Sequence, residues 1–124
     1  MPISCYSNPG VVQEGYVKPE IVAPGEWYSA PLSTTIAPER ALTLAKDTTG
    51  NYALFNGTSA AAPYVAGFVA LMMQKKPSIT VAEIKSNFKE NATVDFWTGK
   101  VPNPQWGYGK LDYSAAEKIL NAVR

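Results

Sequence analysis

One stretch of the sequence decides the fold: Asn56-Gly57-Thr58-Ser59-Ala60-Ala61-Ala62-Pro63. Residues 52–55 before it predict a short strand, and residues 62–76 after its start predict a helix. The first N–H groups of a helix have no partner within the helix, so they stabilise an anion. Acyl transfer needs such a place, because its tetrahedral intermediate develops negative charge on oxygen. Ser59 is therefore a candidate nucleophile, with a helix N-cap as the alternative role.

The predicted helix over 62–76 is apolar on nearly every side, which is typical of a buried helix. Pro63 suits the first turn of that helix, where a missing N–H costs little. Thr80-Val81-Ala82-Glu83 is a capping box and predicts a second helix. Asp112 predicts the cap of a last helix. These last two helices are half polar, so we expect them at the surface.

Composition narrows the class of protein. The 124 residues suit one domain at most, with 46% hydrophobic and 17% charged residues, as in globular proteins. The net charge of +1 comes without a basic stripe, so no nucleic-acid partner is predicted. The apolar run over 60–73 is too short to span a bilayer, so no membrane partner is expected either. The N-terminus has no signal-peptide pattern, and localisation stays undetermined from this sequence.

The sequence offers few residues for disulfide or metal chemistry. The single cysteine, Cys5, excludes an internal disulfide, and we expect a small buried side chain there. No loop has calcium-ligand spacing, so we predict no metal and no cofactor.

The remaining segments predict little regular structure. Residues 18–25 form a short apolar stretch between two prolines, which suits a brief buried strand. Residues 26–51 are polar and irregular, and Pro38 predicts the start of a short helix there. These strands are too few to cover so apolar a helix. We therefore expect an α/β structure that forms one side of a larger domain.

Four segments resemble the subtilisin-like serine proteases (subtilases, peptidase family S8), and they occur in the order of that family. They are Ser7-Asn8-Pro9-Gly10, Lys18-Pro19-Glu20-Ile21-Val22-Ala23-Pro24-Gly25, Asn56-Gly57-Thr58-Ser59-Ala60-Ala61-Ala62-Pro63-Tyr64-Val65-Ala66-Gly67 and Trp106-Gly107-Tyr108-Gly109-Lys110-Leu111-Asp112. The resemblance implies a partial three-layer αβα subtilisin-like fold. It would comprise the C-terminal part of a mostly parallel sheet, a buried central helix and two surface helices. Residues 1–124 would be the C-terminal fragment of one catalytic domain, with 26–51 as a loop insertion.

The same resemblance implies a function. Ser59 would be the nucleophile of a serine endopeptidase that hydrolyses an extended peptide or protein through an acyl-enzyme. Its N–H would be one oxyanion donor, Thr58 would line the site, and Gly57 would let the substrate backbone come close. The family's Asp and His segments fall upstream of this sequence, so the missing N-terminal part of the domain is an expected partner. The family also implies an extracellular location.

Two departures from the family pattern affect these expectations. The chain has no histidine, and a serine hydroxyl is a poor nucleophile without a base. We therefore expect the isolated chain to be inactive, and no spacing singles out Lys18, Lys46 or Lys110 as a substitute base. Tyr64 stands where the family often has a histidine that is not the catalytic base.

The segment 26–51 is longer than in compact family members. Trp27, Tyr28 and Leu32 motivate the hypothesis of a substrate-facing rim. The alternative is a surface insertion that these side chains hold against the core.

Two other functions stay open. The lack of histidine favours a catalytically inert remnant or an assembly module that completes its fold with a partner chain. The sedolisin group of Ser-Glu-Asp proteases shares a similar nucleophile motif and uses a glutamate base. Gly57-Thr58-Ser59-Ala60 with Pro63 fits that group, whereas the segment 18–25 fits it poorly.

Overall fold

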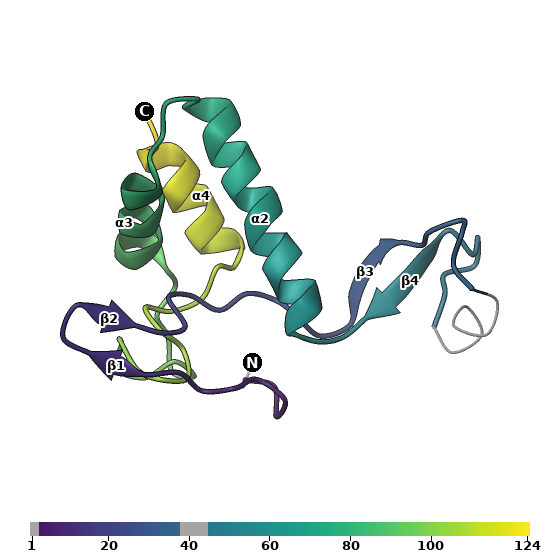
Figure 1. Ribbon diagram of the computed structural model, residues 1–124, viewed down its shortest axis with the longest axis horizontal. Helices are drawn as coiled ribbons and strands as arrows, with labels where there is room; N and C mark the ends of the chain where they lie inside the picture. Colours follow the sequence, from purple (N-terminus) through teal and green to yellow (C-terminus); the bar gives the residue numbers. More distant parts are fainter. Residues whose placement is uncertain (1–2, 38–44) are drawn as a thin grey trace.

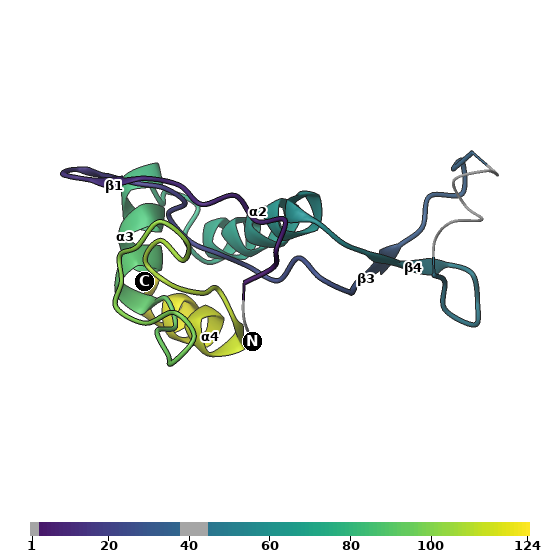
Figure 2. The ribbon, with the colours of Figure 1, turned by 90° about the horizontal axis from the view of Figure 1, so that it is seen from below.

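Three helices and two strand pairs make up the computed structural model, which describes residues 3–37 and 45–124 (Figure 1). The helices pack together, and the second strand pair projects away from them as an arm (Figures 1 and 2). The elements are β1 (Val12–Gln13), β2 (Tyr16–Val17), β3 (Tyr28–Pro31), β4 (Tyr52–Phe55), α2 (Thr58–Lys75), α3 (Val81–Asn91) and α4 (Tyr113–Ala122).

The core lies where the three helices meet. Met72 of α2 and Ile119 of α4 are completely buried, and the rings of Phe68 and Phe88 join α2 to α3 with centroids 6.1 Å apart. Leu111, just before α4, is also completely buried. On α2 and on α4 the buried side chains recur one helical turn apart, so each of these helices contributes one apolar stripe to the core.

Both predicted helix starts after residue 80 are confirmed. The Thr80 hydroxyl accepts a hydrogen bond from the Glu83 N–H at 3.2 Å, and Glu83 accepts one from the Thr80 N–H at 2.7 Å, which completes the capping box. Asp112 caps α4 by accepting a hydrogen bond from the Ala115 N–H at 3.0 Å. These caps satisfy N–H groups that the helices themselves leave without partners.

Helix α2 begins at Thr58, four residues earlier than its sequence-based start. Gly57 occupies the N-cap position, and its carbonyl accepts hydrogen bonds from the N–H groups of Ala60 and Ala61 at 2.9 and 3.4 Å. Pro63 therefore lies inside the helix rather than in its first turn, and the prediction for Pro63 is wrong. The carbonyl of Ser59 consequently lacks the N–H donor that a non-proline residue at 63 would offer.

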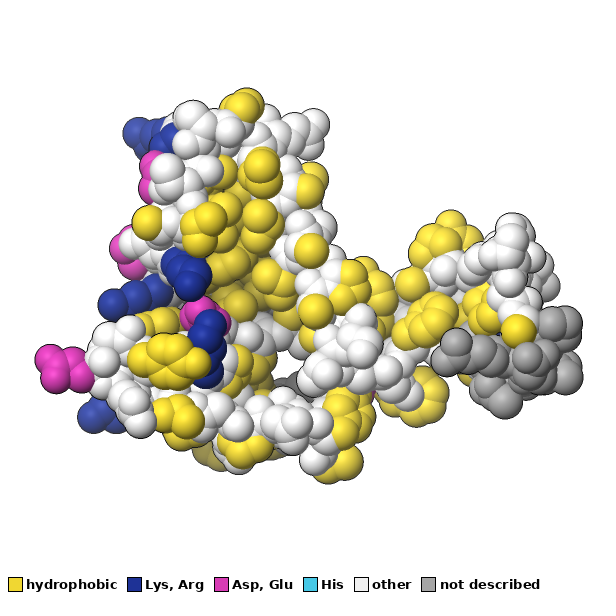
Figure 3. Space-filling model, viewed as in Figure 1, with side chains coloured by type: hydrophobic (Ala, Val, Ile, Leu, Met, Phe, Trp, Pro, Cys, Tyr) yellow, Lys and Arg dark blue, Asp and Glu magenta, His cyan; other side chains and the backbone are white. Residues whose placement is uncertain are grey.

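Only one side of α2 is covered by the described residues. Phe68 and Met72 are its buried residues, whereas Leu71 and Met73 are each 49% exposed. Hydrophobic side chains gather over this part of the molecule in Figure 3. The β3–β4 pair projects as an arm and the β1–β2 pair lies near α3, so neither forms a layer against α2, and much of its apolar surface stays in contact with solvent (Figure 1). Within residues 3–37 and 45–124, no helix has the length and hydropathy for a membrane span.

The partial subtilisin-like α/β fold is confirmed, although little of its parallel sheet lies in this chain. Both strand pairs are antiparallel, β1 with β2 and β3 with β4. In the described residues, parallel pairing is limited to the bridge between Val22 and Lys110. The Val22 N–H donates to the Gly109 carbonyl at 3.0 Å, and the Leu111 N–H donates to the Val22 carbonyl at 2.8 Å. This bridge lies within residues 18–25, where the sequence predicts a brief buried strand, but it pairs the single residue Val22, which is only half-buried.

The segment 26–51 contains more regular structure than the sequence indicates. Its beginning forms β3, and Lys46 bridges Ala53 on the opposite side of β4, so β4 is the middle of three paired segments. The helix expected from Pro38 lies outside the described residues. Cys5 is exposed, so its predicted burial is wrong. The core cluster is built from the helices and the segments beside them and does not include the segment that carries Cys5.

The capping box of α3 makes the stability of the chain depend on pH. The Lys76 ammonium and the Thr80 groups hold the pKa of Glu83 at about 2, below its ordinary value of 4.5. A carboxylate whose pKa is lowered on folding contributes stability above its unfolded pKa and loses it as the pH falls. We expect Glu83→Ala to lower the urea midpoint at pH 7, with a difference from the parent chain that shrinks between pH 4.5 and 2.

The control for this measurement is Glu117→Ala, which removes an exposed glutamate on α4. Unfolding is followed by circular dichroism of the helices. A Glu83→Ala deficit that stays constant down to pH 2 would show that the carboxylate charge has no part in the cap.

Candidate active site

The turn before α2 is fixed by close contact between two motifs that are distant in sequence. Gly57 has φ 121° and ψ 165°, a conformation that residues with side chains rarely adopt. Its N–H donates to the Gly25 carbonyl at 2.7 Å. A Cβ at Gly25 would lie 2.9 Å from the Gly57 carbonyl oxygen and 3.3 Å from the Ala61 Cβ. The Lys18-to-Gly25 segment thus ends directly against the Asn56-to-Pro63 segment, as two parts of one site.

Ser59 is exposed and is the second residue of α2. Because Gly57 holds the N-cap position, Ser59 does not cap the helix. The hydrogen bonds to the Gly57 carbonyl begin with Ala60, so the Ser59 N–H precedes the bonded part of the turn. The first turn contains no acidic residue. Its positive end is therefore uncompensated by its own side chains, next to an exposed hydroxyl.

A cleft opens beside this turn. Its volume is about 650 Å³, and its walls include the Gly25 loop, Gly57 and Thr58 of the turn, and N-terminal residues 3, 4 and 6–8. The Tyr6 hydroxyl donates to the Gly25 carbonyl at 3.0 Å and fastens the N-terminal segment across the loop. Ser59 is not one of the lining residues that the structure describes. Of the predicted site residues, Gly57 and Thr58 face the cleft, and Ser59 lies beside it.

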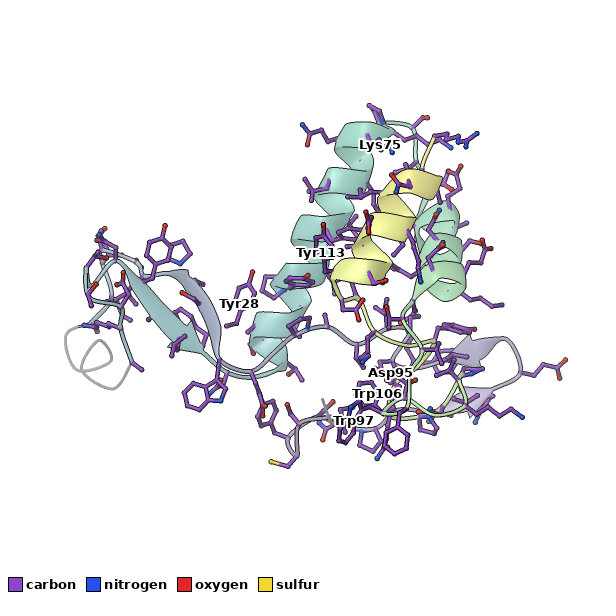
Figure 4. All side chains as sticks on the ribbon, turned by 180° about the vertical axis from the view of Figure 1, so that it is seen from behind. Tyr28, Lys75, Asp95, Trp97, Trp106 and Tyr113 are labelled. Carbon is purple, nitrogen blue, oxygen red and sulfur yellow. The ribbon has the colours of Figure 1, made fainter. Side chains whose placement is uncertain are left out.

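The arm joins the site through two contacts. The Trp27 N–H donates to the Asn56 side-chain oxygen at 2.6 Å. The Tyr28 ring packs edge to face on Tyr64 of α2, with centroids 6.0 Å apart and planes at 86°. Figure 4 shows Tyr28 beside the first turns of α2. Asn56 thus ties the start of the arm to the turn, a contact that sequence reasoning missed, although the place of Asn56 directly before the glycine turn was a usable signal.

These contacts bear on both hypotheses for the segment 26–51. Tyr28 packs against Tyr64 of α2, a side chain that itself lies against the buried core, so the alternative of an insertion held against the core also stays open. Trp27 is 66% exposed next to the turn. The rim hypothesis keeps its structural basis and remains a prediction.

Two of the three lysines considered as bases have carboxylate partners. Lys18 forms an ion pair with Glu20, and Lys110 forms one with Asp95, beside Trp106 (Figure 4). Lys46 lies on the arm. Among the described residues, the structure thus gives no lysine a contact with Ser59.

The acidic residues near the motifs have structural partners. Burial by itself would raise the pKa of Glu20, but hydrogen bonds from Lys18 and Lys85 outweigh it and keep that pKa below its ordinary value. The pKa of Asp112 is also lowered, because hydrogen bonds from the Thr93 hydroxyl at 2.6 Å and from the Ala115 N–H outweigh burial. Over the described ranges, no three His, Cys, Asp or Glu side chains cluster as metal ligands would.

The chain belongs to the subtilase family, because the family model (Peptidase S8) matches residues 2–110. It is 33% identical to serine protease AprX of Bacillus subtilis over 101 residues, which are 82% of this chain and 22% of that protein. It is 41% identical to a subtilisin of Bacillus pumilus over 54 residues, which are 41% of this chain and 20% of that protein. The resemblance seen in the sequence is therefore confirmed, and with it membership of a family of serine-type peptidases.

Comparison with solved structures also finds a protease of similar fold. The CspB protease of Clostridium perfringens is similar with a TM-score of 0.64 and 27% identity, over 94% of this chain and 23% of that chain. The chain spans between 9% and 22% of the length of the curated relatives it matches.

The contact between Gly25 and Gly57 leads to a prediction about the turn. Gly25→Ala adds a methyl group 2.9 Å from a backbone oxygen, so the loop must move away from Gly57. We expect a loss of about 1–3 kcal/mol in the free energy of unfolding, as for an overpacked site. Chemical denaturation of the two chains measures it.

Gly67→Ala is the matched control. Its added Cβ meets nothing within 4 Å, and alanine is better than glycine inside a helix by roughly 0.5–1 kcal/mol. We expect this variant to gain stability. Equal stability of Gly25→Ala and the parent chain would contradict the close approach of the two loops.

Proposed function

We propose that this chain is the nucleophile-bearing part of a subtilisin-like serine endopeptidase, with Ser59 as the residue that attacks the peptide bond. The observation behind this is the position of Ser59, exposed in the first turn of α2 and beside the glycine turn. Family membership supports the reaction class. Because the matched region is a minor part of each relative, the activity of a whole enzyme is itself part of the proposal.

The chemistry follows from the geometry of the turn. The Ser59 oxygen would attack the substrate carbonyl, and negative charge would develop on the carbonyl oxygen. The Ser59 N–H, at the positive end of α2, would donate a hydrogen bond to that oxygen. Collapse of the intermediate would release the amine and leave an acyl group on Ser59, which water then removes. Gly57 would leave room for the substrate backbone, and Thr58 would line the approach.

A histidine base would come from outside these 124 residues, since they include no histidine. A base and the acidic residue that orients it would be supplied by a further part of the domain, either in the same polypeptide or in a partner chain. The exposed apolar flanks of α2, with Leu71 on one side of its buried stripe and Met73 on the other, form a surface that such a part could cover. The chain by itself would then bind weakly and hydrolyse nothing.

That same surface favours a second candidate function, an assembly module without catalysis of its own. Such a module would use α2 to complete the fold of a partner, and Ser59 would have no role. The two candidates differ in whether Ser59 reacts once the domain is complete.

A serine-directed fluorophosphonate distinguishes them. The chain is incubated with the probe alone and with a separately produced N-terminal part of the Bacillus subtilis AprX catalytic domain. We expect labelling at Ser59 only in the mixture, because only there can a base take the proton of the hydroxyl. Mass spectrometry of the labelled peptide identifies the residue.

Two variants complete this test. Ser59→Ala should abolish labelling, while Ser114→Ala, which changes an exposed serine on α4, should leave it unchanged. A complex that forms, as shown by size-exclusion chromatography, but takes up no probe would favour the assembly module and contradict the protease.

A further inference from the structure

A second cavity lies far along the chain from Ser59, between the β1–β2 hairpin and α3. Its volume is about 260 Å³. The hairpin side contributes Tyr16 and Lys18, α3 contributes Lys85 and Lys89, and Tyr108 lies at its edge. Lys18 and Glu20 begin the segment that reaches the candidate active site at Gly25, whereas the β1–β2 hairpin and α3 do not line the cleft of that site.

Positive charge dominates this cavity. Three ammonium groups line it, those of Lys18, Lys85 and Lys89, against a single carboxylate, that of Glu20. Glu20 pairs with Lys18 and, at 3.2 Å, with Lys85. Two positive charges remain uncompensated among the groups that face the cavity. Figure 3 shows basic side chains gathered around an acidic one between the hairpin and the helices.

The lysines are held in place by more than their charges. The Lys89 ammonium lies over the Tyr108 ring, 5.4 Å from its centroid, and the Lys18 ammonium lies 5.9 Å from the centroid of Tyr16. Such contacts stabilise a cation at a fixed position without neutralising it. The ammonium groups therefore stay available as hydrogen-bond donors, and two tyrosine rings form apolar walls beside them.

We propose that this cavity binds a phosphoryl dianion. A phosphoryl group carries close to two negative charges at neutral pH and several acceptor oxygens, and lysine is a common phosphate ligand. It would balance the two excess positive charges and accept hydrogen bonds from Lys85 and Lys89. The group can come from free inorganic phosphate or from an aryl phosphate, whose ring would contact Tyr16 and Tyr108. This site is independent of the proposed proteolytic function.

Inorganic phosphate and phenyl phosphate are each titrated into the full 124-residue chain at constant ionic strength, with chloride as the balancing ion. Amide chemical shifts in the ¹⁵N-labelled chain report binding. We expect saturable shifts confined to residues 15–18 and 85–89. Tighter binding of phenyl phosphate would assign the aryl ester as the ligand, and equal binding would assign free phosphate; both results support the site.

Three variants test the assignment. Lys89→Gln should weaken binding about tenfold, because it removes one charge-assisted hydrogen bond. Glu20→Gln should strengthen binding several-fold, because it removes the carboxylate that competes for Lys18 and Lys85. Lys118→Gln, on α4, should have no effect. A gain of affinity in Glu20→Gln cannot come from a loss of folding, so this variant separates binding from stability.

The opposite results would overturn the proposal. Shifts of equal size with chloride alone would show screening of surface charge and no site. The same conclusion follows if Lys89→Gln and Lys118→Gln weaken binding equally, or if neither phosphate compound saturates.

Discussion

The hydrogen bond from the Gly57 N–H to the Gly25 carbonyl is the contact on which the site depends. It joins the end of one loop to the start of α2, and it requires glycine on both sides, because of the φ of 121° at Gly57 and the 2.9 Å approach at Gly25. The direction of α2 follows from this contact. So do the exposure of Ser59 and the position of the cleft wall, which the same two glycines help to form.

The starts of α3 and α4 were predictable from sequence, because the capping residues that mark them act on neighbouring backbone groups. A capping box lies within four residues, and its hydrogen bonds form wherever the helix is placed. The start of α2 was harder to predict, because it depends on Gly57 being held by Gly25. The proline rule favoured a later start at Ala62, with Pro63 in the first turn, but tertiary contact at the turn outweighed it. The strand β3 was missed for a similar reason, since its pairing with β4 joins residues on opposite sides of a long loop.

The sequence predicted which residues form the candidate site, but it did not predict how they are arranged in space. The motif identified Ser59, Gly57 and Thr58, and the structure places all three in one turn. The motif could not show that Gly57 and Thr58 line the cleft while Ser59 lies beside it. The contact of Tyr28 with Tyr64 was also beyond sequence reasoning, because aromatic residues in a polar loop do not reveal which surface they meet. The cavity of lysines belongs to the same class, since its members come from separate segments.

Amide hydrogen exchange at the start of α2 tests the central claim most directly. Exchange of each amide reports whether its N–H is bonded in the folded chain. If the account is right, the Gly57 amide is protected by the Gly25 carbonyl, the Ala60 amide is protected by Gly57, and the Ser59 amide exchanges quickly in the unoccupied site. Protection of the Ser59 amide equal to that of Ala60, or rapid exchange at Gly57, would contradict it.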